Sequence, residues 1–319
     1  MTPEENKVLA LDIGGTKLAA AVVDLTDGSI CTEVRRAAPS QLGATVVIKT
    51  MFEMGREALH KANLAQPIRV GISFGGPVSG DRKSVMMSNH VKDWEGIPLP
   101  SLAQEAFGVQ AFMDNDANAA ALGSWHYDTR CEPDNMIYLQ VSTGIGSGLI
   151  LGRQLYRGGA LAGEVGHTTI IPDGPECVCG KHGCLESLCA GWALARAGRE
   201  ALKRADPSNP LYQLSNGVSE KVDGHLVIDA ARAGDVQAVE ITTTAFTALG
   251  IAIANMISLF DPAMVILGGG VTRAQAEMRA VLEPVIYREL HPLFKDRCKL
   301  VFSSLDGKET LLGAALLAD

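Results

Sequence analysis

The chain has 319 residues, of which 47% are hydrophobic and only 5% are aromatic, and it contains 34 glycines. The length favours two domains of about 150 residues, and the composition is that of a soluble globular protein, neither disordered nor fibrous. The formal net charge is −8 and the lysines and arginines are scattered, so we expect no nucleic-acid partner.

The N-terminus, the apolar stretches and the cysteines indicate a cytoplasmic protein. The N-terminal segment, MTPEENKVLALDIGG, is acidic before its first apolar run, whereas a signal peptide begins with positive charge. Residues 245–260 are the most hydrophobic stretch, but they include Thr247, Asn255 and Ser258 and are too few to span a membrane, which favours a core helix. Four of the seven cysteines lack the spacing of a disulfide framework: Cys31, Cys131, Cys189 and Cys298. We therefore expect reduced thiols and no membrane partner.

The first third of the chain predicts a strand meander, a helix and a further strand. Residues 8–13 and 17–23 are apolar and β-rich and are joined by Gly14-Gly15-Thr16, which predicts a hairpin. The next predicted elements are a strand near residues 30–37, a helix over 44–62, and a strand over 68–74 that ends in Gly75-Gly76-Pro77.

The rest of the chain alternates predicted helices and strands. A helix over residues 101–107 leads to a strand over 109–113 that ends on Asp114-Asn115-Asp116, and a helix follows over 117–127. MIYLQVSTGIGSGLILG then repeats the order strand, glycine turn, strand. The later predictions are helices over 184–203, 236–260, 273–289 and 309–317, and strands over 264–267 and 299–303. LDIGGTKLAA and QVSTGIGSGLI form a weak internal repeat, which indicates two similarly built halves, unless two hairpins resemble each other by coincidence.

Three glycine clusters mark places where backbone N–H groups can approach a ligand closely. In LDIGGTK, Thr16 and Lys17 can add hydrogen-bond donors for an anion, and Asp12 can face a metal ion. The segment matches neither the P-loop nor the dinucleotide fingerprint. Together with 142–148 and 267–270 it suits a large anion such as ATP; three unrelated turns are the alternative.

The segment MDNDANAA places Asp114 and Asp116, with Asn115 and Asn118, where a strand meets a helix. A carboxylate here can accept a proton from a substrate hydroxyl while a neighbouring amide directs that hydroxyl. Asp116 can equally serve as the N-cap of the alanine-rich helix.

The segment ECVCGKHGCLE and the upstream GEVGH together contain three cysteines and two histidines. His167, Cys177, Cys179 and Cys184 make up the ligand set of a tetrahedral zinc site. His182 is an alternative nitrogen ligand. A redox pair is the rival interpretation, but the close pair is C-x-C and not the thioredoxin-like C-x-x-C.

These segments, in this order and spacing, closely resemble the ROK family of sugar kinases and sugar-responsive regulators. The resemblance rests on LDIGGTKLAAAVVD, DNDANAAALG, STGIGSGLILG, GEVGHTTI and CVCGKHGCLE, and it runs from about Val8 to Leu317. It implies an α/β, two-domain actin-like and hexokinase-like (ribonuclease H-like) ATPase fold. The implied domains are a smaller one, residues 1–115 plus 305–319, with the first phosphate hairpin, and a larger one, residues 116–304, with the zinc site and the second hairpin.

The resemblance also implies residue roles. Asp116 corresponds to the catalytic base, and the expected sugar contacts are Gly76, Asn89, Asn115, Glu164, His167 and Glu186. The nucleotide, bound with Mg²⁺ held near Asp12, would be contacted by Asp12, Gly14, Gly15, Thr16, Lys17, Thr143, Gly144, Gly268, Gly269 and Gly270. A structural Zn²⁺ would orient the imidazole of His167 toward a sugar hydroxyl.

The implied activity is that of an ATP-dependent hexose kinase, with glucose phosphorylated at O6 as the leading case. N-acetylmannosamine, N-acetylglucosamine and fructose are alternative substrates. GISFGGPVS departs from the frequent GIPGPVD and approaches the GIS-x-GG pattern of some N-acetylmannosamine kinases, which leaves the N-acyl question open. Those enzymes carry arginine where Pro77 stands. A repressor is not expected, because only seven residues precede the first strand; a non-catalytic sugar sensor is the other alternative. A homodimer is expected because dimers are common in the family.

Overall fold

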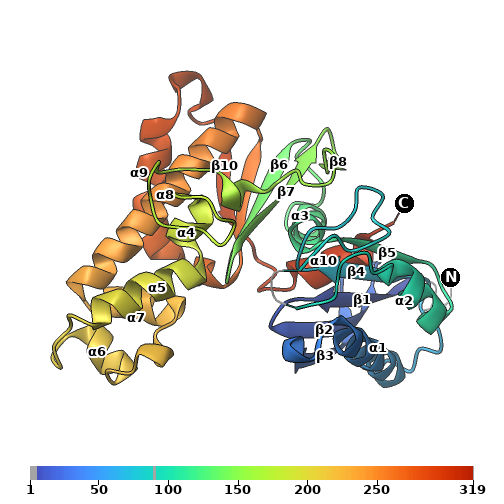
Figure 1. Cartoon of the computed structure of the whole chain (residues 1–319). Coiled ribbons are helices and arrows are strands. Elements are labelled where there is room, and N and C mark those ends of the chain that lie inside the picture. The colour runs from blue at the N-terminus through green and yellow to red at the C-terminus, as the bar shows by residue number, and fades with distance from the viewer. Residues whose placement is uncertain (1–5, 89–90, 319) are drawn as a thin grey trace. The chain divides into compact units, whose positions relative to one another are not determined.

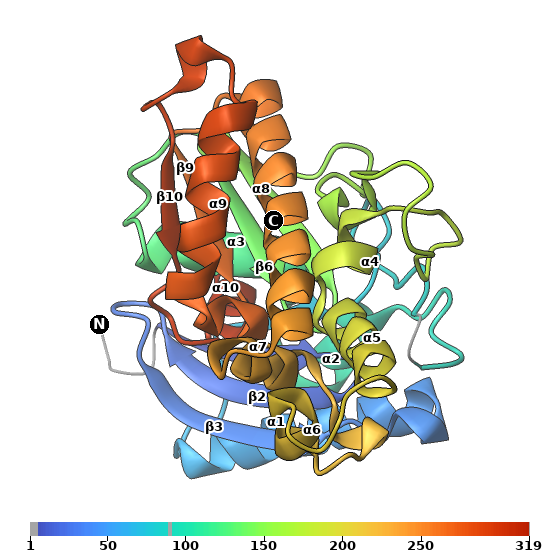
Figure 2. The ribbon, with the colours of Figure 1, turned by 90° about the vertical axis from the view of Figure 1, so that its left-hand side faces the viewer.

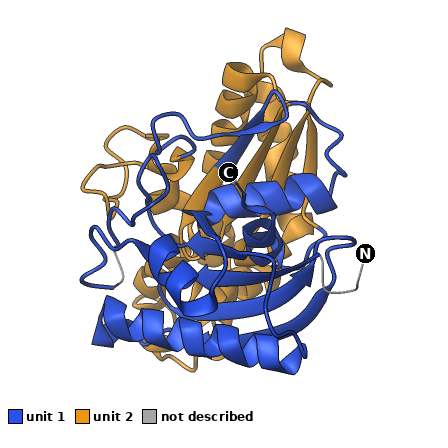
Figure 3. Ribbon diagram, turned by 90° about the vertical axis from the view of Figure 1, so that its right-hand side faces the viewer, with its two compact units in different colours: residues 1–134, 148–163, 304–319 blue, residues 135–147, 164–303 orange. Residues whose placement is uncertain are grey.

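The computed structural model describes residues 6–88 and 91–318. Contacts divide the chain into two compact units: residues 1–134, 148–163 and 304–319 form the first, and residues 135–147 and 164–303 form the second (Figure 3). The described residues contain two five-stranded sheets, with orders β3-β2-β1-β4-β5 and β10-β9-β6-β7-β8.

The first sheet has helices on both of its faces (Figure 1). β2 is antiparallel to β1 and β3, whereas β4 is parallel to both β1 and β5. The elements of this unit are β1 (Lys7–Ile13), β2 (Lys17–Asp24), β3 (Ile30–Ala37), η1 (Ser40–Leu42), α1 (Ala44–Lys61), β4 (Val70–Phe74), α2 (Leu99–Phe107), β5 (Ala111–Asn115), α3 (Asp116–Tyr127), β8 (Gln154–Tyr156) and α10 (Glu309–Leu316).

The first sheet is buried on both faces because its central strands are apolar at successive positions. Side chains alternate between the two faces of a strand. Leu9 and Leu11 of β1 pack in the cluster that includes α1 and α2, and Val8 and Ala10 pack in the cluster that includes α10. Two-sided burial of this kind fixes the strands and therefore the positions of their ends.

Helices α3 and α10 pack against each other at a distance that only glycine permits. A Cβ atom on Gly313 would lie 1.6 Å from the carbonyl oxygen of Ala119, and a Cβ atom on Gly123 would lie 2.2 Å from that of Glu309. Real Cβ atoms do not approach this closely, so the two glycines are required for the α3–α10 contact. The C-terminal helix thereby joins the first unit.

The second sheet repeats the strand topology of the first. β6 (Met136–Val141), β7 (Ile145–Leu151), β8, β9 (Met264–Gly268) and β10 (Lys299–Phe302) are arranged in the order that β1, β2, β3, β4 and β5 adopt in the first sheet. The fourth strand is parallel to the first in both sheets. The internal repeat predicted from the two glycine hairpins is therefore present in the fold.

Most helices of the described residues belong to the second unit, and its longer helices run side by side in Figure 2. Its remaining elements are η2 (Val165–His167), α4 (Leu185–Cys189), α5 (Gly191–Leu202), α6 (Pro210–Ser215), η3 (Ser219–Lys221), α7 (Gly224–Arg232), α8 (Val236–Phe260), η4 (Gly270–Arg273), α9 (Gln275–Glu289) and η5 (Pro292–Phe294). α8 lies beside α9 and also contacts α4, α5 and α7.

Within the part of the chain that the structure describes, α8 alone is long and apolar enough to cross a membrane. Of its most apolar 18-residue window, 56% is buried inside the protein. Residues such as Phe246, Leu249 and Ile253 are buried, so α8 is a core helix.

The structure corrects the predicted helix over residues 184–203, which is two helices that meet at Ala190. Ala190 has an extended ψ of 158°, and the next two residues donate their N–H groups to the turn after β6: Gly191 to Ser142 O at 2.8 Å and Trp192 to Thr143 O at 3.3 Å. The break thus satisfies the first N–H groups of α5 with carbonyls outside the helix. The short helices α6 and α7 were not predicted.

The compact units differ from the predicted domains in two segments. Residues 116–134 and 148–163 cluster with the first unit and not with residues 164–303. The physical reason is that α3 packs on α10 through Gly123 and Gly313, and that Arg157 pairs with Asp114 of β5. The domain boundary at residues 115 and 116 stays a prediction.

Candidate active site

In the first unit, three parallel strands end beside one another and place polar residues in register. Asp12 of β1 pairs with Ser73 of β4, and Ser73 pairs with Asp114 of β5. The Ser73 hydroxyl donates to Asp12 Oδ1 at 2.9 Å. Burial raises the pKa of Asp12 to about 6, although the hydroxyl of Ser73 and the charge of Arg35 oppose this rise. Ligands bind at the carboxyl ends of such strands in open α/β sheets.

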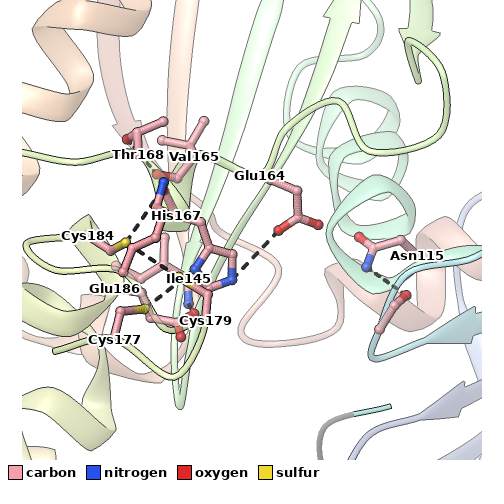
Figure 4. Close-up of polar contacts among 12 residues, drawn as sticks. Asn115, Ile145, Glu164, Val165, His167, Thr168, Cys177, Cys179, Cys184 and Glu186 are labelled. Carbon is pink, nitrogen blue, oxygen red and sulfur yellow. Dashed lines mark hydrogen bonds and ion pairs between the residues drawn. The ribbon is translucent and has the colours of Figure 1, made fainter. Parts of the chain in front are cut away.

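Asn115 ends β5 and fixes the start of α3. Its Oδ1 atom accepts N–H groups of Ala117 at 2.9 Å and Asn118 at 3.4 Å, and it is therefore the N-cap of the helix. Its Nδ2 atom donates to the carbonyl of Gly76 at 3.1 Å, the contact drawn beside the Asn115 label in Figure 4. Two residues that were predicted separately as sugar contacts are thus bonded to each other.

Asp116 occupies the first position of α3, and Asn115, not Asp116, is the residue before the helix. Asp116 Oδ1 accepts the N–H of Ala117 at 2.9 Å. Its other oxygen lies near a turn without side chains, since a Cβ atom on Gly75 would be 3.7 Å from Asp116 Oδ2. Asp116 as a whole residue is partly exposed.

Arg157 pairs with Asp114 and was not predicted from the sequence as a site residue. The Arg157 Nε atom lies 2.6 Å from Asp114 Oδ2, and the Asp114 side chain is only 1% exposed. No local pattern connects residues 43 positions apart. Only the burial of Asp114, next to the candidate base Asp116, indicates that a cationic partner is needed.

The glycine hairpin between β1 and β2 closes tightly and leaves its polar side chains outside. The N–H of Gly14 donates to the carbonyl of Lys17 at 3.1 Å, while Thr16 and Lys17 are exposed. Gly15 is partly exposed at the tip. The hairpin therefore presents backbone and cationic donors to solvent, as a phosphate ligand requires.

In the second unit, the predicted histidine and cysteines form one cluster. The ligand atoms of His167, Cys177, Cys179 and Cys184 all lie within 4.8 Å of one another. The Sγ atoms of Cys179 and Cys184 are 3.7 Å apart, and Cys177 Sγ is 3.6 Å from His167 Nδ1. Two thiolates on a tetrahedral zinc ion are about 3.8 Å apart, so the donors fit that ion. His182 is outside this set and bonds to the carbonyl of Gly174 at 3.2 Å.

The surroundings of Cys177 and Cys184 disfavour the thiolate, whereas hydrogen bonds, that from the N–H of Lys181 first, lower the pKa of Cys179 although burial opposes this. Burial raises the pKa of Cys177, and burial together with the neighbouring Cys179 and Cys177 raises the pKa of Cys184 to about 12. These thiols are therefore protonated in the absence of a cation, and a cation that binds them displaces their protons.

The imidazole of His167 connects the cysteine cluster to a carboxylate (Figure 4). Its Nδ1 atom faces Cys177, and its Nε2 atom lies 4.0 Å from Glu164 Oε2. The Glu164 side chain is 49% exposed, and desolvation of its covered part raises its pKa. The carbonyl of His167 also accepts the ammonium of Lys181 at 2.7 Å, which holds the residue in place.

Glu186 contacts the second glycine turn, which contains Thr143 and Gly144. Its side chain is buried, Oε2 accepts the N–H of Ile145 at 2.9 Å, and Oε1 accepts the indole N–H of Trp192 at 3.3 Å. A Cβ atom on Gly144 would lie 2.8 Å from Glu186 Oε2. Glu186 therefore supports the turn that contains Thr143 and Gly144 in addition to any role toward a sugar.

The turn after β9 lies against the turn after β6. Gly268 pairs with Gln140 in the sheet, and Gly269, with φ of +96°, would place a Cβ atom 2.5 Å from the carbonyl of Val141. His225 lies beside Gly270, with Nε2 3.4 Å from the position of a Cβ atom there. The two predicted nucleotide segments of this unit thus meet, and His225 is a neighbour that the sequence did not indicate. Asn89, the remaining predicted sugar contact, lies outside the described residues.

Comparison with known proteins identifies the family. The ROK family model matches residues 8–319. The glucokinase of Thermotoga maritima is 33% identical over 310 residues, which cover 97% of this chain and 96% of that protein. The N-acetylmannosamine kinase of Yersinia pseudotuberculosis is 31% identical over 288 residues, which cover 88% of this chain and 91% of that protein.

The structural comparison agrees with the sequence comparison. The ROK family glucokinase from Streptomyces griseus, solved in complex with glucose and AMPPNP, superposes with a TM-score of 0.85 at 32% identity and covers 98% of this chain and 99% of that one. The predicted actin-like, hexokinase-like fold is confirmed, with two sheets of mixed strand direction. The chain belongs to the ROK family.

Proposed function

We propose that the protein is an ATP-dependent hexose kinase that transfers the γ-phosphoryl group to a sugar hydroxyl, with O6 of glucose as its main acceptor. The observation that carries this proposal is the placement of Asp116 directly after β5, beside the side-chain-free turn at Gly75 and Gly76. The identity to the Thermotoga maritima glucokinase supports the choice of glucose.

Asp116 would act as the general base. Its carboxylate would accept the proton of the attacking hydroxyl as that oxygen bonds to the γ-phosphorus. The bond from the γ-phosphorus to the β–γ bridging oxygen would break, with ADP as the leaving group. The Nδ2 group of Asn115 would direct the same hydroxyl. Gly76, whose carbonyl holds Asn115, and Asn89 are assigned to sugar binding. We assign Glu164, Glu186 and the Nε2 atom of His167 to the other sugar hydroxyls.

The nucleotide would be bound by the glycine turns. In the first unit these are Gly14 and Gly15, with Thr16 and Lys17, and in the second Thr143, Gly144 and the turn Gly268 to Gly270. Asp12 offers the hard oxygen ligands that Mg²⁺ prefers, and its desolvated carboxylate gains from a nearby cation. Mg²⁺ bound with ATP near Asp12 would supply neutralisation of charge on the phosphates.

The cysteine cluster would hold a structural Zn²⁺. Cys177, Cys179, Cys184 and the Nδ1 atom of His167 would be its four ligands, which leaves no position open for substrate. The ion would fold the loop from residue 176 to 186 and keep the imidazole in one orientation. We expect the enzyme in the cytoplasm as a homodimer.

N-acetylmannosamine is the second candidate substrate. GISFGGPVS resembles the pattern of some kinases for that sugar, and the Yersinia pseudotuberculosis relative is one of them. Pro77 argues against it, because it stands where those enzymes carry arginine.

A coupled assay of ADP release tests the function. Glucose, mannose, fructose, N-acetylglucosamine and N-acetylmannosamine are each supplied with MgATP, and kcat/KM is compared. Glucose is expected to give the highest value. A higher value for an N-acetylhexosamine would reassign the substrate, and calorimetric sugar binding without ADP release would identify a sensor instead of a kinase.

A further inference from the structure

We infer that Arg157 is a positioning residue for phosphoryl transfer, because its ion pair with the buried Asp114 fixes the strand end that carries Asn115 and Asp116. This inference rests on the proposed kinase function and adds a residue to it. All four residues belong to the first unit.

Asp114 is a carboxylate almost without access to solvent, and three donors compensate it. Oδ2 lies 2.6 Å from Arg157 Nε, and Oδ1 accepts the backbone N–H of Asn115 and the Nδ2 group of Asn118, each at 2.8 Å. Its side chain is 1% exposed. A buried carboxylate is tolerated only with such a set of charge-assisted hydrogen bonds, and the guanidinium is the one full positive charge in it.

The hydrogen bonds of Asp114 hold one residue before Asp116 in the sequence and one residue after it. Asn115 precedes Asp116 and Asn118 follows it by two residues, and both donate to the same oxygen, Asp114 Oδ1. The Asp116 carboxylate bonds to the N–H of Ala117 between them. A shift of Asp114 would therefore move the backbone that sets the direction of Asp116.

The orientation of Asn118 depends on this carboxylate as well. Asn118 is 3% exposed, and among the described residues its Oδ1 atom has no hydrogen-bond partner. Its amide is thus held through Nδ2 alone, by the charge on Asp114. Without Arg157, Asp114 would be a buried anion with two neutral donors and no ion-pair partner, and the groups around it would rearrange to supply further donors.

Arg157 itself is held from a separate part of the chain. It follows the edge strand β8, and its carbonyl accepts the N–H groups of Ala160 at 2.9 Å and Ala162 at 3.3 Å, which closes a tight turn. The Arg157 side chain is 30% exposed, so its replacement by alanine removes packing of the buried stem as well as a charge. The double-mutant cycle described below separates the catalytic effect from this loss of packing.

The first test replaces Arg157 with alanine and with lysine. Arg157→Ala is expected to lower kcat between about 10-fold and 100-fold, because displacement of a reacting group by an ångström has effects of this size. Lysine restores the charge without the planar donor geometry and should recover part of the loss. Arg153→Ala is the matched control: Arg153 lies four residues earlier and pairs with Asp134 at 3.1 Å, but both side chains are largely exposed. It should change kcat by less than about twofold.

A double-mutant cycle separates positioning from general destabilisation. If Arg157 acts through Asp116, Arg157→Ala should have little further effect on kcat in an Asp116→Ala enzyme, whereas loss of folded protein lowers kcat by the same factor in both backgrounds. The paired change Asp114→Asn with Arg157→Gln removes both charges, should fold if the single variant does not, and should be more active than Arg157→Ala.

The outcomes distinguish this inference from the kinase proposal. Wild-type protein without hexose-dependent ADP release overturns both. Active wild type together with an Arg157→Ala variant that keeps kcat within twofold, or with equal losses in the two backgrounds of the cycle, overturns the role of Arg157 alone.

Discussion

The imidazole of His167 lies with Nδ1 3.6 Å from the Sγ atom of Cys177. Its Nε2 atom is on the opposite side of the ring and lies 4.0 Å from Glu164. One side chain therefore belongs to the cysteine cluster through one nitrogen and is available to a ligand through the other. A change in the cluster should for this reason be detected in ligand binding as well as in metal content.

Replacement of Cys179 tests this relationship. Cys179→Ser should lose zinc and raise the KM for sugar, because His167 loses the ion that orients it. Zinc is measured by atomic emission per mole of protein, and sugar affinity by calorimetry. Cys31→Ser is the control, since Cys31 is exposed and outside the cluster. Stoichiometric zinc in the Cys179 variant would assign the metal to other ligands.

Replacement of Asp116 tests the proposed base. Asp116→Ala should lower kcat by at least about 100-fold, which is a typical contribution of a general base, with a smaller effect on the KM for sugar. Asp134→Ala is a suitable control because the Asp134 side chain is 71% exposed. Near-normal turnover by the Asp116 variant would exclude this role.

The raised pKa of Asp12 predicts that the stability difference between the wild type and an Asp12 variant depends on pH. Its folded-state pKa, about 6, is raised above the ordinary value of 3.8, so the folded protein favours the neutral acid. Ionisation of Asp12 therefore lowers the free energy of unfolding. This loss of stability is absent below about pH 4, grows as the pH rises to about 6, and stays constant at higher pH. Asp12→Asn should thus stabilise the protein at pH 7.5, by about 3 kcal/mol, and not at pH 4.

Urea denaturation of both proteins at several pH values, without divalent cations, measures this difference. A stability gain that is equal at pH 4 and pH 7.5 would contradict the assigned pKa shift. The same variant should lose kinase activity, since it lacks the carboxylate proposed to hold Mg²⁺.

Gly144 predicts a steric effect on Glu186. Gly144→Ala would place a methyl group 2.8 Å from Glu186 Oε2, which already bonds to the N–H of Ile145. The carboxylate or the turn must move, so we expect kcat/KM to fall by roughly tenfold or more. Gly159→Ala is the control, because a Cβ atom there meets nothing within 4 Å. Equal activity of the two variants would show that the turn accommodates the methyl group.

The sequence predicted most of the fold because the elements are strongly periodic. The limits of α8, Val236–Phe260, and of β3, Ile30–Ala37, agree with the prediction, since both are bounded by polar or turn residues. The break at Ala190 was missed because it depends on carbonyls of Ser142 and Thr143, which are distant in sequence. Local propensity contains no information about such partners.

The candidate site was predictable where its residues are close in sequence or chemically distinctive. The three cysteines and His167 were identified from their ligand chemistry, and they form one cluster. Arg157 was missed because arginines are common on surfaces, and only the burial of Asp114 reveals its importance. The cap of α3 was assigned to Asp116 as one alternative, but Asn115 fills it, since the strand ends two residues later than predicted.

The return of α10 to the first unit has a consequence for synthesis on the ribosome. Leu311, Leu312, Ala314 and Ala315 cover one face of a sheet whose strands are synthesised long before α10. That face stays without its apolar cover until residues 309–316 have left the exit tunnel. The first sheet therefore cannot complete its core until α10 has been synthesised, and the nascent chain needs protection from aggregation at that face until then.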